Sequence, residues 1–353
     1  MNKFIPFLLI AALFVTAFFA TNCSGRKMLG ASDGAIKTQP GFGPAQVYVP
    51  GGPFTIGGSL ADDIAYTNDV HKRETQIAQF MMDEHEVTNA DWKLFVADEG
   101  NAFLPNDTLT WHEPHLNGAK VIEYYENEAF ANFPVVGITW EQAVEYCEWR
   151  TEKVRAAGDE STAPFRLPTE AEWEYASISL HHSTTESQFE TVEYGKTYPW
   201  YGTGLREPDK KQTHGRFLAN FSMEEKGVPP TKEVRSYWPN DFYLFDMAGN
   251  VNEWVNDQYQ QFPGEKVASS AEDFPLFGVT SLVNEKSRVI KGGSWNDDPH
   301  WLIPATRRHL QKDQAASTIG FRTVRSTHLQ GKLPAGQKMK KADSRKPIKR
   351  PKN

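Results

Sequence analysis

The hydrophobic pattern divides the chain into an apolar leader, a long stretch of short mixed runs and a polar tail. Residues 4–20 are almost all apolar and follow a short charged start, which is the pattern of a signal peptide. The run is borderline in length for a membrane-spanning helix. The pattern predicts four segments: a signal peptide at 1–22, a tether at 23–45, a folded domain at 46–327 and a basic, disordered tail at 328–353.

Short strand and helix patterns alternate within the folded segment. Two β-rich runs flank the sequence Pro50-Gly-Gly, which favours a hairpin. Residues 80–92 predict a strand that leads to Thr88, the N-cap of a helix. Farther on, Thr169 and Glu172 have the spacing of a capping box. Together with ten Trp and 26 Gly, these short elements indicate an irregular, loop-rich α+β domain rather than a helix bundle.

Charge is distributed unevenly along the chain, which carries 38 Lys and Arg, 45 Asp and Glu and a net charge of −7. Residues 332–353 hold nine basic and one acidic residue, a net charge of +8. The rest therefore holds 29 basic and 44 acidic residues, a net charge of −15. An acidic body disfavours nucleic acid as a partner. The tail is expected either to be a solvated end or to dock on an acidic surface.

The two cysteines lie in different settings. Cys147 lies on a helical pattern with Trp140 and Val144, so we expect a buried, packed thiol. Cys23 follows the leader in Ala20-Thr-Asn-Cys23, which resembles a bacterial lipobox and implies lipidation of Cys23. Several acyl chains on this residue would give a stable membrane anchor. An uncleaved anchor and an ordinary secretory signal are the alternatives.

A cassette near the C-terminus carries the clearest likeness to a known family. It contains residues 240–254, then Arg288-Val-Ile-Lys-Gly-Gly-Ser-Trp295, and then Ile319-Gly-Phe-Arg322. These motifs resemble the formylglycine-generating enzymes, also called sulfatase-modifying factors. The resemblance extends over residues 46–325 and implies the irregular, C-type-lectin-like fold of that family.

The resemblance also implies which chemistry this chain lacks. In catalytic members, two cysteines after the Gly-Gly-Ser-aromatic turn bind copper and oxidise a substrate cysteine. The aligned residues here are Asp297 and Leu302, and no cysteine occurs from 296 to 302. Copper(I) and thiol oxidation need soft sulfur ligands. We therefore expect no copper, no catalytic residues and no enzyme of this kind, although His300 with Asp297 leaves altered chemistry as an alternative.

One metal site of the family has counterparts in this sequence. The resemblance implies a structural calcium ion held by Asp246, Gly249, Val251 and Glu253, through side-chain and backbone oxygens. Aspartate in the first position adds negative charge, which an oxygen-liganded cation favours. The alternative is a tight turn in which Asp246 accepts backbone amides and Glu253 pairs with an arginine.

Other charged residues have structural interpretations. Glu170, Glu172 and Glu174 are expected to stabilise a helix N-terminus rather than to act as acids or bases. The pair His181-His182 has no third ligand at a suitable spacing, so we expect no metal there. The cassette also contains basic residues that either tie loops to carboxylates and carbonyls, which we favour, or line a substrate cleft. They are Arg288, Lys291, Arg307, Arg308 and Arg322.

A narrower resemblance rests on the lipobox, the missing thiols, Tyr198-Pro-Trp-Tyr-Gly-Thr-Gly-Leu-Arg-Glu-Pro208 and Pro304-Ala-Thr-Arg-Arg-His309. Together these features resemble the gliding-motility lipoproteins GldK and GldJ of Bacteroidetes. GldK-like proteins form a periplasmic ring with GldN in the type IX secretion machinery. The resemblance implies a homo-oligomeric assembly on the periplasmic face of the outer membrane, with GldN-like and other secretion components as partners.

Overall fold

The computed structural model describes residues 42–57, 73–106, 109, 120–160, 162–178, 197–200, 202–207, 215–224, 230–260 and 283–327. The predicted signal peptide, Cys23, the His181-His182 pair and the basic tail lie outside these residues. Within the described ranges, no helix is both long enough and apolar enough to cross a membrane.

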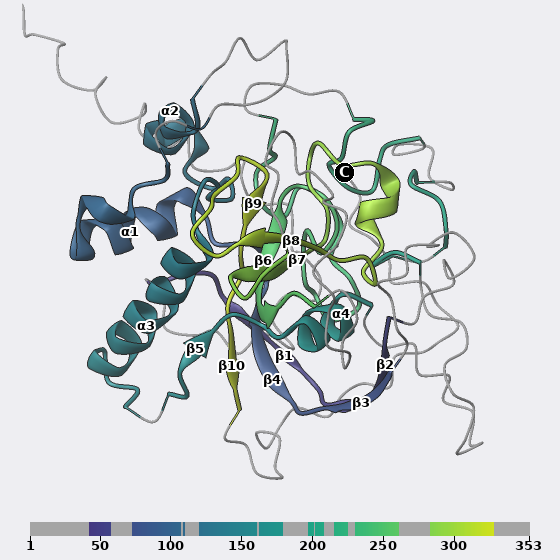
Figure 1. Cartoon of the computed structure of the whole chain (residues 1–353), viewed down its shortest axis with the longest axis horizontal. Helices are drawn as coiled ribbons and strands as arrows, with labels where there is room; N and C mark the ends of the chain where they lie inside the picture. The colour runs from purple at the N-terminus through teal and green to yellow at the C-terminus, as the bar shows by residue number, and fades with distance from the viewer. Residues whose placement is uncertain are drawn as a thin grey trace, which may run out of the picture.

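Short strands and helices alternate along the chain (Figure 1). The strands are β1 (Gln46–Val49), β2 (Gly52–Ile56), β3 (Arg73–Ile77), β4 (Phe80–Asp83), β5 (Phe165–Arg166), β6 (Asn252–Gln258), β7 (Ser287–Lys291), β8 (Arg308–Gln311), β9 (Ile319–Gly320) and β10 (Val324–Ser326). The α-helices are α1 (Asn89–Glu99), α2 (Val121–Glu126), α3 (Trp140–Ala156) and α4 (Glu170–Ile178). Short 3-10 helices are η2 (Asn101–Phe103), η4 (Glu128–Phe130) and η5 (Pro299–Leu302). This mixed content confirms the predicted α+β class.

The predicted hairpin at Pro50-Gly-Gly is wrong, because β1 pairs with β4 and β2 pairs with β3. The pairs Val49↔Phe80 and Gly52↔Ile77 continue one antiparallel register, so the four strands form one bent ribbon (Figure 1). At the bend, a Cβ on Gly51 would lie 2.5 Å from the carbonyl oxygen of Ile77. The glycine therefore permits a close approach of two strands rather than a chain reversal.

Two four-stranded sheets organise the domain, with strand orders β1-β4-β10-β5 and β8-β7-β6-β9. Strands β6 and β9 are parallel, whereas the other neighbours in these sheets are antiparallel. Helix α4 contacts β2 and β3 as well as β6 and β7, so it joins the bent ribbon to the second sheet. Because β6, β7 and β9 all contain motif residues, this sheet brings the parts of the C-terminal cassette together.

The core beneath α1 and α3 is aromatic. Thr88 caps α1, as predicted, and it also forms a capping box with Asp91. Trp92 of α1 stacks on Tyr146 of α3 with 5.5 Å between ring centroids, and Phe321 meets both rings edge-on. Cys147 lies in the same cluster and is 2% exposed. Burial raises the pKa of its thiol, which confirms a packed rather than a reactive cysteine.

Candidate functional site

A buried ion pair contains Asp297, the residue that we expect to align with the first thiol of the family's catalytic members. Asp297 is 2% exposed. Its two oxygens accept hydrogen bonds from Arg308 Nη1 at 2.8 Å and Nη2 at 2.6 Å. The backbone N–H and the hydroxyl of Ser294 each donate to Asp297 Oδ2 at 2.7 Å, and Asn252 Nδ2 donates at 3.0 Å. Through these hydrogen bonds, the Asp297 carboxylate connects the Gly-Gly-Ser turn to β6 and β8.

The second thiol position is apolar. Leu302 at the end of η5 is 0% exposed and packs in a hydrophobic cluster with Tyr198, Phe221 and Ile303. Its neighbour Trp301 lies beneath the guanidinium of Arg308, 4.4 Å from ring centroid to Cζ. A hydrocarbon side chain offers neither a metal ligand nor a nucleophile. The two aligned positions are thus built into the packing of the domain.

The alternative cluster around His300 is not assembled, because its members have separate partners. His300 meets the ring of Trp301 edge-on at 5.0 Å between centroids. Burial, together with the nearby guanidinium of Arg308, lowers the pKa of the His300 imidazole. Asp298 accepts a hydrogen bond from Ser222 Oγ at 3.3 Å. With Asp297 held by Arg308, these contacts do not form an acid–base pair.

The turn that contains the predicted calcium residues is tight and left-handed. Asp246 has φ 55°, and its Oδ2 accepts from the backbone N–H of Arg235 at 2.7 Å. Gly249 has φ 75°, and a Cβ there would lie 2.3 Å from the carbonyl oxygen of Asn220. Only glycine fits such a position. Val251 follows the turn and is 1% exposed in a hydrophobic cluster.

Glu253, the fourth predicted calcium ligand, faces a cation that belongs to the protein itself. Arg322 Nε donates to its two oxygens at 2.9 and 2.8 Å, and Arg322 Nη2 donates at 2.7 Å. Trp173 Nε1 adds a hydrogen bond of 2.8 Å. This is the alternative arrangement considered above, a turn closed by Asp246 beside a glutamate–arginine pair.

The predicted residues fit calcium in part. Asp246 Oδ1 is buried and has no hydrogen-bond partner, which suits a hard, oxygen-liganded cation. Glu253 fits poorly, because Arg322 holds both of its oxygens. Among the residues that the structure describes, no group of three or more His, Cys, Asp or Glu side chains is placed to hold a metal ion. Calcium at Asp246, Gly249, Val251 and Glu253 therefore stays a prediction.

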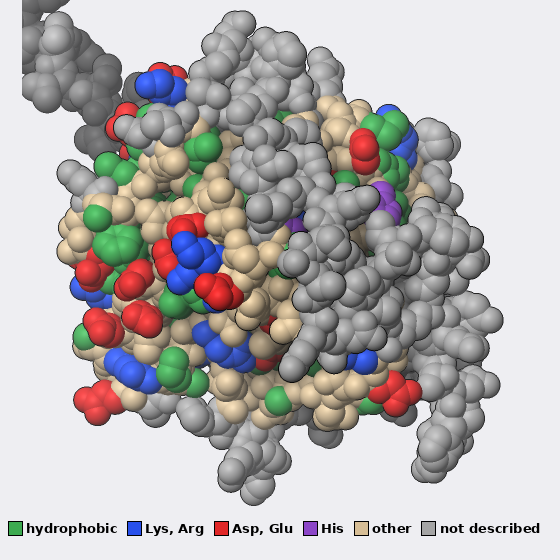
Figure 2. Space-filling view, viewed as in Figure 1, with side chains coloured by type: hydrophobic (Ala, Val, Ile, Leu, Met, Phe, Trp, Pro, Cys, Tyr) green, Lys and Arg blue, Asp and Glu red, His purple; other side chains and the backbone are tan. Residues whose placement is uncertain are grey.

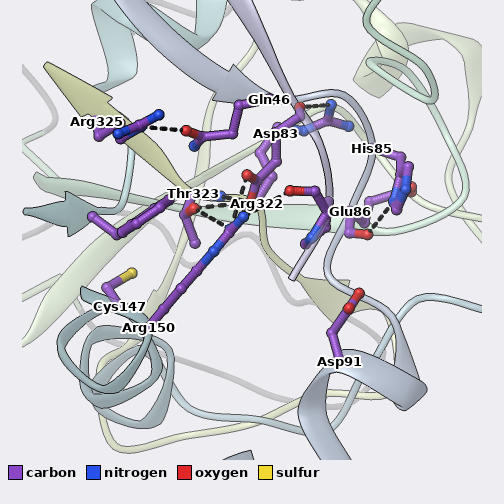
Figure 3. A network of polar contacts seen from close by, with 12 residues as sticks. Gln46, Asp83, His85, Glu86, Asp91, Cys147, Arg150, Arg322, Thr323 and Arg325 are labelled. Atoms are coloured by element: carbon purple, nitrogen blue, oxygen red, sulfur yellow. Dashed lines mark hydrogen bonds and ion pairs between the residues drawn. The ribbon is translucent and has the colours of Figure 1, made fainter. Parts of the chain in front are cut away.

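A second buried network, which the sequence did not predict, centres on Asp83, Arg150 and Thr323 (Figure 3). Both oxygens of Asp83 accept from Arg150 Nη1 at 2.9 Å, and Thr323 donates to Oδ2 through its backbone N–H at 2.9 Å and its hydroxyl at 2.8 Å. Arg150 also donates to the carbonyl of Pro44 at 2.7 Å, and Arg322 Nη1 donates to the carbonyl of Asp83 at 3.2 Å. The sequence feature that could have indicated this network is Arg150, a charged residue on the otherwise apolar face of α3.

The basic residues of the cassette bind carboxylates and carbonyls of neighbouring segments, as predicted. Lys291 Nζ lies 3.2 Å from Glu174 Oε2 and 3.5 Å from Glu170 Oε1, and Arg307 Nε lies 2.9 Å from Glu170 Oε1. These side chains are almost fully buried. Glu172 forms the predicted capping box with Thr169 at the start of α4. The carboxylates of α4 are thus held in ion pairs or at the helix terminus.

Comparisons with known proteins match the folded segment. The formylglycine-generating enzyme of Mus musculus is 26% identical over 322 residues, which cover 78% of this chain and 73% of that protein. The inactive C-alpha-formylglycine-generating enzyme 2 of Bos taurus is 27% identical over 317 residues, which cover 78% of this chain and 86% of that protein. Similarity thus extends both to a protein named as an enzyme and to one named as inactive.

Solved structures show the same fold. PvdO from Pseudomonas aeruginosa superposes with a TM-score of 0.59 at 21% sequence identity, over 84% of this chain and 98% of that one. This likeness agrees with the predicted irregular α+β architecture. The family model of the sulfatase-modifying factor enzyme 1-like domain matches residues 32–327, which is most of the chain. The protein therefore belongs to the family of sulfatase-modifying factor enzyme 1-like domains.

Proposed function

We propose that this protein is a non-catalytic lipoprotein that acts as an assembly component of the type IX secretion and gliding machinery, in the manner of GldK. The observation that carries the non-catalytic part is the buried pair of Asp297 and Arg308 beside Leu302. A carboxylate that is saturated with donors and a leucine in a packed cluster stand where the family's enzymes need two thiols. A GldJ-like role is the alternative within the same group of lipoproteins.

The assembly part is supported by where the two narrower motifs lie. Tyr198, from the first motif, and Ala305, from the second, belong to one hydrophobic cluster. Tyr198 stacks on the partly exposed Trp200 with 4.9 Å between centroids, and the guanidinium of the exposed Arg206 lies 3.5 Å from the ring centroid of Phe217. Aromatic and arginine side chains held rigidly near the surface are typical of protein interfaces.

The surface charge also favours a protein partner over nucleic acid. On the described part of the face in Figure 2, basic side chains lie singly among acidic ones and form no continuous basic patch. A nucleic-acid interface needs clustered Lys and Arg. With lipidated Cys23 as its anchor, the protein would lie on the periplasmic face of the outer membrane and form a ring with a GldN-like partner.

The proposal is tested by recovery from membranes solubilised in detergent. We expect the tagged full chain in the outer-membrane fraction, together with a GldN-like protein that mass spectrometry identifies. Cys23→Ser should move the protein out of the membrane fraction, because the acyl chains are lost. Trp200→Ala is expected to reduce recovery of the partner by about tenfold or more, as for a central interface aromatic.

Leu94→Ala is the matched control for the interface, because Leu94 is 46% exposed on α1 and lies outside the two motifs. It should leave recovery unchanged. Recovery of other gliding proteins without the GldN-like partner would favour the GldJ-like role. An unprocessed N-terminus, or a soluble protein without partners, would contradict the proposal.

The second expected outcome concerns activity. A peptide with the cysteine motif of a sulfatase, incubated with the protein and copper, should retain its cysteine, because neither aligned position offers sulfur. Mass spectrometry of the peptide would detect conversion of cysteine to formylglycine. A heat-treated sample is the control, and turnover above that control would restore the enzyme interpretation.

A further inference from the structure

Helix α3 carries a row of acidic side chains on its exposed face, which we call the acidic stripe. Its members are all exposed and follow one another at spacings of four, three and four positions, so they lie along one side of the helix: Glu141, Glu145, Glu148 and Glu152. The buried residues of α3 pack into the domain from the other side of the helix. Like charges at these spacings destabilise a helix, and the core makes no use of them.

The acidic stripe has little counter-charge among the described residues. Glu141 pairs with Lys312 at 2.7 Å, whereas the other three members have no ion pair within the described part of the chain. The basic side chains near the end of α3 are engaged elsewhere. Lys153 pairs with Asp98 at 2.7 Å, and Arg155 donates to a backbone carbonyl. In Figure 2, acidic side chains accordingly gather over the region that α1 and α3 occupy in Figure 1.

The chain leaves the described domain beside the C-terminal end of this stripe. Strand β10 pairs with β5, which lies between α3 and β10 (Figure 1). The backbone N–H of Phe165 in β5 donates to Thr151 Oγ1 of α3 at 2.8 Å. Arg325 Nη1 of β10 lies 3.9 Å from Asp159 Oδ2, just beyond the end of α3. A basic side chain of the last strand thus already reaches a carboxylate at this end of the helix.

The sequence that follows β10 supplies the complementary charge. Residues 332–353 carry a net charge of +8, and eight of their nine basic residues lie from 338 to 352. The stripe is about 16 Å long, at about 1.5 Å per residue of helix. A flexible linker of ten residues, such as 328–337, has an end-to-end distance of about 16–19 Å. The basic residues can therefore reach the whole stripe from within the same chain.

We propose that the basic segment 338–352 docks on the acidic stripe of α3 in its own chain. Tethering gives the segment an effective concentration in about the millimolar range, which favours it over the tail of a second copy. Single exposed ion pairs are weak, so the contact depends on several of them and is released by salt. A docked segment is withheld from anionic lipid and from acidic partners. This contact does not depend on the proposed function.

The position of the segment is tested by cross-linking the full chain with a carbodiimide, which joins a lysine amine to a carboxylate that it touches. At low salt we expect cross-links from 338–352 to the stripe, mapped by mass spectrometry. They should disappear at about 1 M salt, where the Debye length is about 3 Å. An equal mixture of isotope-labelled and unlabelled protein separates links within one copy from links between copies. We expect links within one copy.

Tryptic cleavage of the tail gives a second readout that does not need the carboxylates as reactants. The triple variant Glu145→Gln, Glu148→Gln and Glu152→Gln keeps good helix formers at exposed positions, so it should fold. At an effective concentration of about 1 mM, a contact of about 0.1 mM affinity slows cleavage about tenfold, so the variant should be cleaved about tenfold faster at low salt. High salt should remove the difference.

The matched control removes three exposed carboxylates from α2 and η4 instead, through Glu123→Gln, Glu126→Gln and Glu128→Gln. Its tail should be cleaved at the wild-type rate. Equal cleavage of the wild type and the stripe variant would overturn the proposal and leave the tail as a solvated end. Cross-links between copies would also overturn it and assign the stripe to the tail of a second molecule. Links confined to other carboxylates would place the tail elsewhere.

Discussion

Replacing Asp83 by asparagine is expected to lower the free energy of unfolding by about 3–5 kcal/mol. Asp83 is 0% exposed and Arg150 is 2% exposed, and the guanidinium donates to both carboxylate oxygens. Asparagine preserves the shape of the side chain but leaves Arg150 as a buried charge without a counter-charge. Removal of one partner from such a pair is far more damaging than removal of an exposed pair.

The measurement is equilibrium chemical denaturation, monitored by tryptophan fluorescence. Trp92 and Trp173 are buried, so their emission should change when the protein unfolds. Glu128→Gln is the matched control, because Glu128 pairs with Lys93 at 2.5 Å but its side chain is 83% exposed. That change should stay within about 1 kcal/mol of the wild type. Equal stabilities for the two variants would show that the Asp83 network contributes little to the fold.

The sequence predicts those features of this protein that depend on neighbours along the chain. The N-cap at Thr88 and the capping box of Thr169 with Glu172 follow from nearby residues, and both form. The burial of Cys147 follows from its place on an amphipathic helix. The predicted hairpin at Pro50-Gly-Gly was wrong because it depends on contacts that are distant along the chain. Two glycines permit either a turn or a close approach of two strands. Pairing of β1 with β4 and of β2 with β3 determines which of the two forms.

For the predicted calcium residues, the sequence left two arrangements open, and the structure contains the alternative one, an ion pair between Glu253 and Arg322. The family resemblance implied that Asp246 and Glu253 belong to a single ligand set, because both lie in one motif. Arg322 reaches Glu253 from a segment 69 residues farther along and holds both of its oxygens. Glu86 comes from the other end of the domain, 164 residues before its partner Asn250. Local spacing carries no information on contacts at such separations.

Asp297 and Leu302, which we expect to align with the two thiols of the family's catalytic members, both have structural contacts in this chain. Asp297 connects the Gly-Gly-Ser turn to Asn252 on β6 and Arg308 on β8, so it contributes to the same sheet that organises the cassette. Leu302 contributes to the cluster that unites the two narrower motifs. Both residues therefore have a structural role, and replacing them by cysteine should lower the free energy of unfolding.

The double variant Asp297→Cys with Leu302→Cys is therefore expected to be destabilised without gaining activity. Loss of the Asp297 carboxylate leaves Arg308 buried without its counter-charge, at a cost of about 3–5 kcal/mol. Loss of the leucine side chain adds a cavity penalty of the order of 2 kcal/mol. Denaturation should show a lower midpoint than for the wild type, and a sulfatase-type peptide with copper should keep its cysteine.

Adding Arg308→Met to this double variant tests whether the unpaired guanidinium causes the loss of stability. Replacement of both members of a buried ion pair by uncharged side chains can be nearly neutral. The triple variant should therefore recover stability relative to the double variant, although the hydrogen bond from Arg308 to Asn252 is also lost. No recovery would mean that packing around Leu302, rather than the unpaired guanidinium, dominates the loss. Formylglycine production by the double variant would instead show that two thiols alone suffice to restore the oxidase on this scaffold.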